Sequence, residues 1–126
     1  MRIATLAEVA DRCLEGATFD HCLADFLDGF YRAPAAEPLS KEPLLLAPRF
    51  GEAGRVQDAY LAAVGEELAR RFALPQPTWA GGDTRRLRRP WFAMPMAAVR
   101  AVLILESPAP FRSRNLFVSE NALSRA

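Results

Sequence analysis

The sequence predicts a mainly α-helical protein, a single domain over residues 1–126 with four to five helices. Three observations support this prediction. A chain of 126 residues has the length of one domain and can bury a real hydrophobic core. Apolar residues recur at three- and four-residue spacing, which is typical of amphipathic helices. Capping residues, glycines and prolines stand where these stretches begin and end.

Two helices are expected in the first third of the chain. Thr5 and Glu8 have the spacing of a capping box, so the first helix begins after Thr5, and Gly16 is a suitable stop. Cys13 falls on its apolar face and is expected in the core. The stretch 19–32 repeats apolar residues at helical spacing and predicts the second helix, with an acidic opposite face.

A proline-rich crossover follows. Residues 33–48 contain four prolines with leucines between them. Proline removes backbone donors and fixes φ, so a continuous helix is excluded here. The leucines indicate an extended segment that crosses over the core.

Two further helices are expected after the crossover. One runs from about 54 to 73 and ends before Pro75. The other runs from Pro95 to about 106 and is apolar nearly all round, which predicts a central position. Near the C-terminus, segment 111–118 is expected to form a short extended stretch and no helix or domain of its own. Ser119 is expected to cap a short last helix that reaches residue 126.

Composition excludes several classes of protein. Hydrophobic residues make up 51% and charged residues 25%, with a net charge of +1, as in soluble globular proteins. Two cysteines and one histidine predict neither a disulfide framework nor a metal site, and no cofactor is expected. The sequence has no apolar run of about 20 residues and no export signal, so we expect a cytoplasmic protein that does not bind membranes.

The sequence offers little that could support catalysis. His21 lies between Asp20 and Cys22, but neighbours on a helix point roughly 100° apart and do not face one another. No phosphate-binding glycine loop or nucleophile elbow is present. We therefore expect a protein that is not an enzyme and has no catalytic residues.

Charge is divided unevenly between the two halves. Residues 1–69 carry six cations and twelve carboxylates, a net −6, whereas residues 70–126 carry ten arginines and three carboxylates, a net +7. Such a division indicates either two surfaces with different partners or halves that attract each other within the fold.

An arginine cluster stands out in the second half, next to aromatic residues. The candidate partner-binding residues here are Arg85, Arg86, Arg88, Arg89, Trp91 and Phe92. Guanidinium groups bind phosphates and aromatic rings stack on bases, so one interpretation is a nucleic-acid surface, with a log–log salt slope of about −3 to −4. An acidic protein partner and internal pairing with the first half are the two alternatives. No helix-turn-helix or zinc-finger frame surrounds the cluster.

The C-terminal segment supplies the other candidate binding residues, which are Arg112, Arg114, Asn115 and Phe117. The segment either folds back, with Phe117 and Leu123 as core anchors, or inserts into a partner. On the second interpretation, alanine at Arg112 and Arg114 should weaken a complex without unfolding the domain.

The motifs at 89–93 (Arg-Pro-Trp-Phe-Ala), 106–108 (Glu-Ser-Pro) and 111–126 support a resemblance. This last third of the chain resembles a group of small bacterial proteins encoded beside a predicted nucleotidyltransferase, as the antitoxin-like member of a toxin–antitoxin pair. The resemblance implies a non-enzymatic protein that binds and neutralises a cognate toxin enzyme by direct contact. A nucleic-acid-binding module that uses residues 85–89 is the alternative, and homo-oligomers are possible in either case.

Overall fold

The computed structural model describes residues 2–125 and is mainly helical. This part of the chain contains seven α-helices and one two-stranded sheet. Four of the helices are nine residues or longer and the other three are single turns. The predicted mainly α class is thus confirmed.

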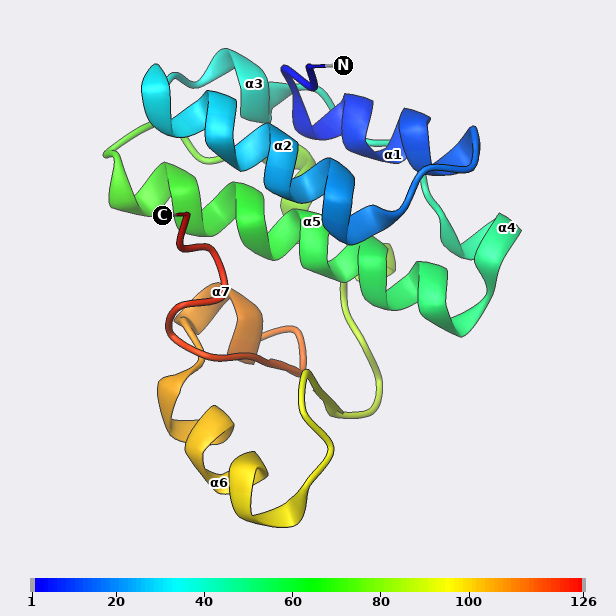
Figure 1. Cartoon of the computed structure of the whole chain (residues 1–126), viewed down its shortest axis with the longest axis vertical. Coiled ribbons are helices and arrows are strands. Elements are labelled where there is room, and N and C mark those ends of the chain that lie inside the picture. The colour runs from blue at the N-terminus through cyan, green and yellow to red at the C-terminus, as the bar shows by residue number, and fades with distance from the viewer. Residues whose placement is uncertain (1, 126) are drawn as a thin grey trace.

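The three helices that form the body of the molecule are α1 (Leu6–Leu14), α2 (Phe19–Arg32) and α5 (Glu52–Arg71). In Figure 1, α2 lies beside α1 and α5 runs along its other side. The predicted start of α1 is confirmed, because the Glu8 amide donates to Thr5 Oγ1 at 3.1 Å. Gly16 ends the helix with φ +107°, a backbone conformation that favours glycine.

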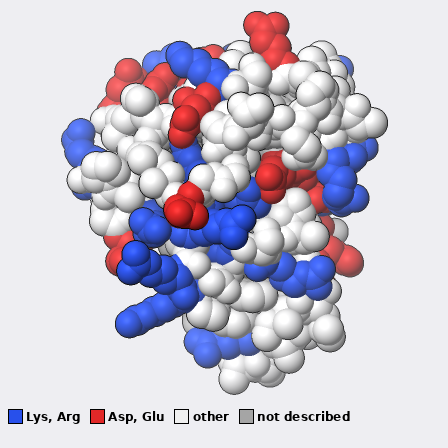
Figure 2. Space-filling view, turned by 180° about the vertical axis from the view of Figure 1, so that it is seen from behind, with Lys and Arg blue, Asp and Glu red and all other residues white. Residues whose placement is uncertain are grey.

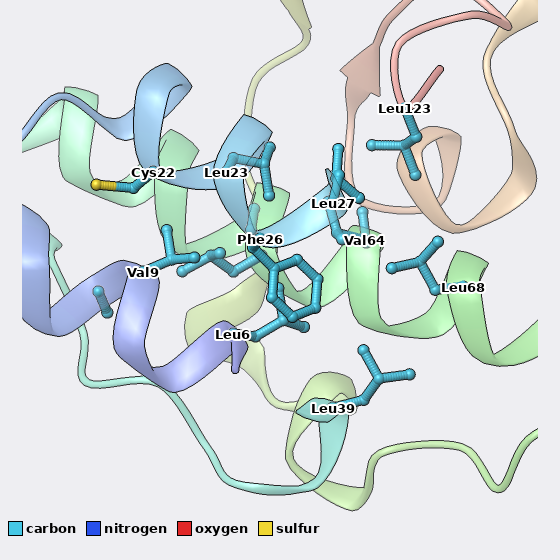
Figure 3. Close-up of a cluster of buried hydrophobic side chains, with 14 of the residues drawn as sticks. Leu6, Val9, Cys22, Leu23, Phe26, Leu27, Leu39, Val64, Leu68 and Leu123 are labelled. Atoms are coloured by element: carbon cyan, nitrogen blue, oxygen red, sulfur yellow. The ribbon is translucent and has the colours of Figure 1, made fainter. Parts of the chain in front are cut away.

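The hydrophobic core lies between these helices and also takes in segments from the rest of the chain. Figure 3 shows side chains of α1, α2 and α5 packed together, with Leu39 and Leu123 at the edge of the cluster. Cys13 and Cys22 are both buried. Burial, together with the neighbouring Cys22, raises the pKa of the Cys13 thiol to about 11. Because the core joins Ile3 at one end to Leu123 at the other, the two halves of the sequence share it.

The proline-rich crossover differs from the prediction of an extended segment. It contains two one-turn helices, α3 (Glu37–Ser40) and α4 (Ala47–Phe50), each with a proline in its first turn. A proline at that position costs no hydrogen bond, because the first amides of a helix have no partner within it. The leucines do cover the core as expected, since Leu39 and Leu46 are buried.

The second half begins with two short 3₁₀ turns, η1 (Thr78–Gly81) and η2 (Asp83–Arg85), which pack on α5. Beyond them lie strand β1 (Trp91–Phe92), helix α6 (Ala97–Glu106), helix α7 (Ala109–Arg112) and strand β2 (Leu116–Phe117). The two strands pair in parallel, Trp91 opposite Leu116 and Phe92 opposite Phe117. The expected extended segment near the C-terminus is therefore this short strand.

The predicted central position of the helix at 95–106 is wrong. Helix α6 projects away from the three-helix body (Figure 1), and Leu103 is its one buried residue. The helix also begins two residues later than predicted, with Met96 as its N-cap. The expectation of burial rested on composition alone, and an apolar helix is equally able to face a partner.

The predicted last helix is also wrong for the residues that the structure describes. Residues 120–123 form turns, and the Ser119 hydroxyl accepts from the Asn121 amide at 3.1 Å within such a turn. Residue 126, the predicted end, lies outside the described residues. Leu123 is buried, so this segment folds back onto the core, and Tyr31 fixes it by donating to the Leu123 carbonyl at 2.7 Å.

Among the helices described, none combines the length and the apolar character needed to cross a membrane.

Candidate functional site

Arg85, the first arginine of the predicted cluster, is not on the surface. Its side chain is 0% exposed, and its guanidinium stacks on Trp79 at 4.9 Å. It donates to the carbonyls of Pro43 at 2.5 Å and Asp58 at 3.3 Å, and lies 3.8 Å from the Asp58 carboxylate. For this residue the internal-pairing alternative holds, and a partner-binding role is excluded in the folded chain.

Asp58 completes this buried arrangement from α5. Its two carboxylate oxygens accept from the amides of Leu46 at 2.6 Å and Ala47 at 3.0 Å, which fixes the start of α4. Burial raises its pKa, and the two amides and Arg85 oppose that rise. Arg85 and Asp58 therefore join the crossover, α5 and η2 from inside the fold.

Arg114 is also buried, at 3% exposure. It donates to the carbonyls of Pro110 and Ala80, both at 2.8 Å, and pairs with Glu66 of α5 at 2.7 Å. It therefore anchors the C-terminal segment to the body. The expectation that Arg114 could be replaced without disturbing the fold is incompatible with these contacts.

Four predicted binding residues join the two strands instead of forming an exposed patch. Trp91 and Asn115 are linked by the Trp91 amide, which donates to the Asn115 carbonyl at 2.8 Å. Asn115 has φ +63°, a left-handed conformation that asparagine tolerates, and its Nδ2 donates to the Leu87 carbonyl. The rings of Phe92 and Phe117 stack with centroids 5.0 Å apart. These four side chains are half-buried, and their contacts link residues 91–92 to residues 115–117.

The segment between the strands carries a feature that the sequence analysis missed. Residues 93–107, which we call the α6 arm, expose large apolar side chains, among them Leu105 at 81% and Met96 at 61%. The others are Met94, Val102 and Ile104. Large exposed apolar patches mark interaction sites in folded proteins. A signal for this was present in the sequence, because Arg100 lies within the apolar stretch and a charged side chain is costly to bury in a core.

The root of the α6 arm is held firmly. The buried Ser107 hydroxyl accepts from the Val118 amide at 2.8 Å and lies 2.7 Å from the Leu103 carbonyl and 3.0 Å from that of Val118. Within α6, Arg100 lies over the ring of Phe92, the residue just before the arm, at 5.0 Å. The arm is thus fixed in a projecting position with its apolar side chains outward.

Exposed arginines accompany this apolar surface. Arg86, Arg88, Arg89 and Arg112, all predicted binding residues, are exposed, as is Arg100 on the arm itself. In Figure 2 the lowest part of the molecule, where α6 lies, is white with blue side chains. The α6 arm and its surroundings therefore combine apolar and positive character.

A pocket of about 530 Å³ lies between the first turns of α5 and residues 87–91. It is lined by Arg55, Arg88, Arg89 and Trp91, with Glu52 among the other lining residues. Trp91 also lines a second pocket of about 440 Å³, together with Phe19 and Tyr60. The two pockets share the lining residues Trp91 and Val56.

Other opposite charges from the two halves of the chain pair within the fold. Besides the pairs of Arg85 and Arg114, Arg125 binds Asp28 of α2 at 2.8 Å. The hydrogen bond from Arg125 lowers the pKa of the Asp28 carboxyl. Some of the opposite charges of the two halves therefore form ion pairs that hold the halves together. The exposed arginines near the arm are not among these pairs.

The described residues show no grouping suited to metal binding. Within residues 2–125, no three His, Cys, Asp or Glu side chains lie close enough together to hold a metal ion. His21 is exposed on α2, while Cys22 beside it is buried in the core. The chain brings these two residues to different faces, as the helical spacing predicts.

Comparisons of the chain with protein-family models, with curated proteins and with solved structures find no match.

Proposed function

We propose that this protein is a non-enzymatic binding protein whose α6 arm docks on a protein partner. On the resemblance of residues 89–126, the partner is a cognate bacterial toxin enzyme of the nucleotidyltransferase type, and the protein acts as its antitoxin-like neutraliser. The contact is direct, between proteins.

The observation that carries the proposal is the exposed apolar surface of the α6 arm. Burying such side chains in an interface stabilises a complex by roughly 25 cal/mol per Å² of apolar area removed from water. The arm is already fixed by Ser107 and by the Phe92–Phe117 stack. Because little order has to be gained on binding, the entropic cost of association is reduced.

The charges near the arm indicate the chemistry of the partner. Arg100 lies on the arm and Arg112 on the neighbouring α7, both exposed. Arginine is a favoured anchor residue in protein interfaces and binds carboxylates with two parallel hydrogen bonds. We therefore expect a partner surface with an apolar centre and an acidic rim.

The test is co-expression with the product of the neighbouring gene, which the resemblance implies to be a nucleotidyltransferase. We expect a complex that survives nuclease and relief of growth arrest by the unaltered protein. In the double variant Val102→Asp and Leu105→Asp, two charges would be buried in the interface, so binding should weaken by about 30-fold or more.

The matched control is Leu44→Asp. Leu44 is 59% exposed and belongs to the segment that connects α3 and α4, two helices that lie away from α6 in Figure 1. This variant should bind and neutralise as the unaltered protein does. Full neutralisation by the Val102→Asp and Leu105→Asp variant would exclude the arm as the docking surface. An absence of any complex with the unaltered protein would exclude the proposed partner.

The nucleic-acid alternative now depends on fewer residues. With Arg85 buried, three of the four clustered arginines remain exposed. If all three touched phosphates, the log–log salt slope would be no steeper than about −3. A steep salt dependence together with loss of the captured material on nuclease treatment would favour this alternative over a protein partner.

A further inference from the structure

We propose that the pocket between α5 and residues 87–91 binds a phosphorylated nucleoside, with the phosphate on Arg55, Arg88 and Arg89 and the base against Trp91. The ligand is either a free nucleotide or the terminal nucleotide of a nucleic acid, since both present the same groups. This site shares no residue with the apolar surface of the α6 arm, so the two proposals stand or fall separately.

The first argument is that three arginines from two parts of the chain line one pocket. Arg55 comes from the first turns of α5, and Arg88 and Arg89 come from the segment before β1. Among the residues that the structure describes, none accepts a hydrogen bond from these three side chains or forms a salt bridge with them. By contrast, both terminal nitrogens of Arg85 and both of Arg114 donate to backbone carbonyls within the fold. Three arginines that line one space and have no such partner in the fold suit a phosphate, which accepts paired hydrogen bonds from arginine.

The second argument is the aromatic side chain in the same pocket. Trp91 is half-buried and lines the space beside the arginines. Its ring is held by an edge-on contact with Tyr60, with centroids 6.5 Å apart. A fixed aromatic ring next to arginines is the arrangement on which nucleic-acid bases stack. Inorganic phosphate would leave this surface unused.

Size and the remaining charge agree with this ligand. A pocket of about 530 Å³ is in the range that binds small molecules. Glu52, which also lines it, repels phosphate but accepts hydrogen bonds from ribose hydroxyl or base amino groups. The phosphate is therefore directed to the arginines and the nucleoside toward Glu52 and Trp91.

The experiment is calorimetric titration of the whole protein with four probes: AMP, GMP, inorganic phosphate and adenosine. At least one nucleotide should bind more than tenfold more tightly than inorganic phosphate or adenosine. Arg88→Ala with Arg89→Ala, and separately Arg55→Ala, should each weaken nucleotide binding at least tenfold. Trp91→Phe should weaken nucleotide binding while leaving any phosphate binding unchanged.

Arg86→Ala is the matched control, because Arg86 is exposed in the same segment but does not line the pocket. Its nucleotide affinity should stay within about twofold of the unaltered protein, and circular dichroism should show every variant folded. A 5′-phosphorylated trinucleotide then separates the two sources, since tighter binding than the mononucleotide assigns the site to nucleic-acid ends and weaker binding assigns it to free nucleotides. No nucleotide binding by the folded protein, equal affinity for inorganic phosphate, or undiminished binding in the Arg88→Ala and Arg89→Ala variant would each overturn the proposal.

Discussion

At the scale of single residues, arginines of similar appearance in the sequence have opposite roles. Arg112 and Arg114 are two residues apart in the chain, yet Arg112 is exposed and Arg114 is buried against Ala80, Pro110 and Glu66. Arg85 and Arg86 are adjacent and differ in the same way. The burial of an arginine requires acceptors for its donors, and those acceptors come from distant parts of the chain.

Replacing Arg114 should therefore test stability rather than binding. Arg114→Ala leaves the Ala80 and Pro110 carbonyls without their buried donor, and should lower the free energy of unfolding by about 2–4 kcal/mol. Arg112→Ala, at an exposed site, should change it by less than about 0.5 kcal/mol. Urea unfolding followed by circular dichroism measures both, and equal stability of the two variants would show that the buried contacts contribute little.

A glycine provides a second residue-scale prediction. Gly54 lies where α5 passes close to α4, and a Cβ there would clash with the Leu46 backbone. Gly54→Ala should destabilise the protein by roughly 1–3 kcal/mol through overpacking. The control is Gly29→Ala in α2, where a Cβ would make ordinary contacts at 3.8 Å and the helix would gain propensity. Thermal unfolding of both variants measures the difference, and a Gly54→Ala protein as stable as Gly29→Ala would contradict the close approach.

At the scale of elements, the α6 arm is an apolar helix that contributes little to the core. Its position depends on its root, where β1 pairs with β2 and Ser107 binds the backbone of Val118. The arm is thus stabilised by a few hydrogen bonds, the Phe92–Phe117 stack and the contact of Arg100 with the Phe92 ring. The arm is expected to keep its position while these contacts persist, and to open before the three-helix body when one of them is removed.

Removal of the Ser107 hydroxyl should loosen the arm. Ser107→Ala leaves the buried Val118 amide without an acceptor, at a cost of about 1–3 kcal/mol. Hydrogen exchange should then become faster in α6 while α2 and α5 keep their protection. Ser113→Ala, which removes an exposed hydroxyl bonded to the Pro110 carbonyl, is the control and should leave α6 unchanged. Equal exchange rates of α6 in the Ser107→Ala and Ser113→Ala variants would mean that the position of α6 does not depend on Ser107.

At the scale of the whole molecule, the acidic first half and the basic second half hold each other. The pairs Arg85–Asp58, Arg114–Glu66 and Arg125–Asp28 each join residues from opposite halves. Two of the three arginines are buried, so their pairs are screened by salt much less than surface pairs. The opposite net charges of the two halves therefore help to hold the fold together, in addition to setting the charge of its surface.

The pH dependence of stability is a second property of the whole molecule. Burial raises the pKa of Cys13 from 9.0 to about 11 and that of Tyr60 from 10.0 to about 12. In the unfolded chain both groups lose their protons at lower pH than in the folded protein. The contribution of these two groups to the free energy of unfolding is thus fully present below about pH 9. It is lost as the pH rises through their pKa values in the folded protein.

The expected outcome is a urea midpoint that falls between about pH 8 and about pH 10.5. The double variant Cys13→Ala and Tyr60→Phe lacks both ionisable groups, so its midpoint should fall less over the same range, whatever its stability at pH 8. Parallel declines in the two proteins would assign the alkaline sensitivity to other groups.

Much of the fold could be predicted from local patterns. The helices at 6–14, 19–32 and 52–71 follow from apolar spacing, from the Thr5 cap and from the stop at Gly16, all of which act within a few residues. The candidate site could be predicted only in part. The exposed Arg88, Arg89 and Arg112 were identified, but nothing local distinguishes them from Arg85 and Arg114.

The sequence by itself determined the mainly helical class, the body helices and their apolar faces, because propensity, capping and periodicity are local. The tertiary structure alone decided which arginines are buried, that Trp91 shares a pocket with Arg55, and that α6 faces outward. The physical reason is that burial depends on partners distant in sequence. An apolar helix shows the same pattern whether the surface that covers it belongs to its own chain or to another protein.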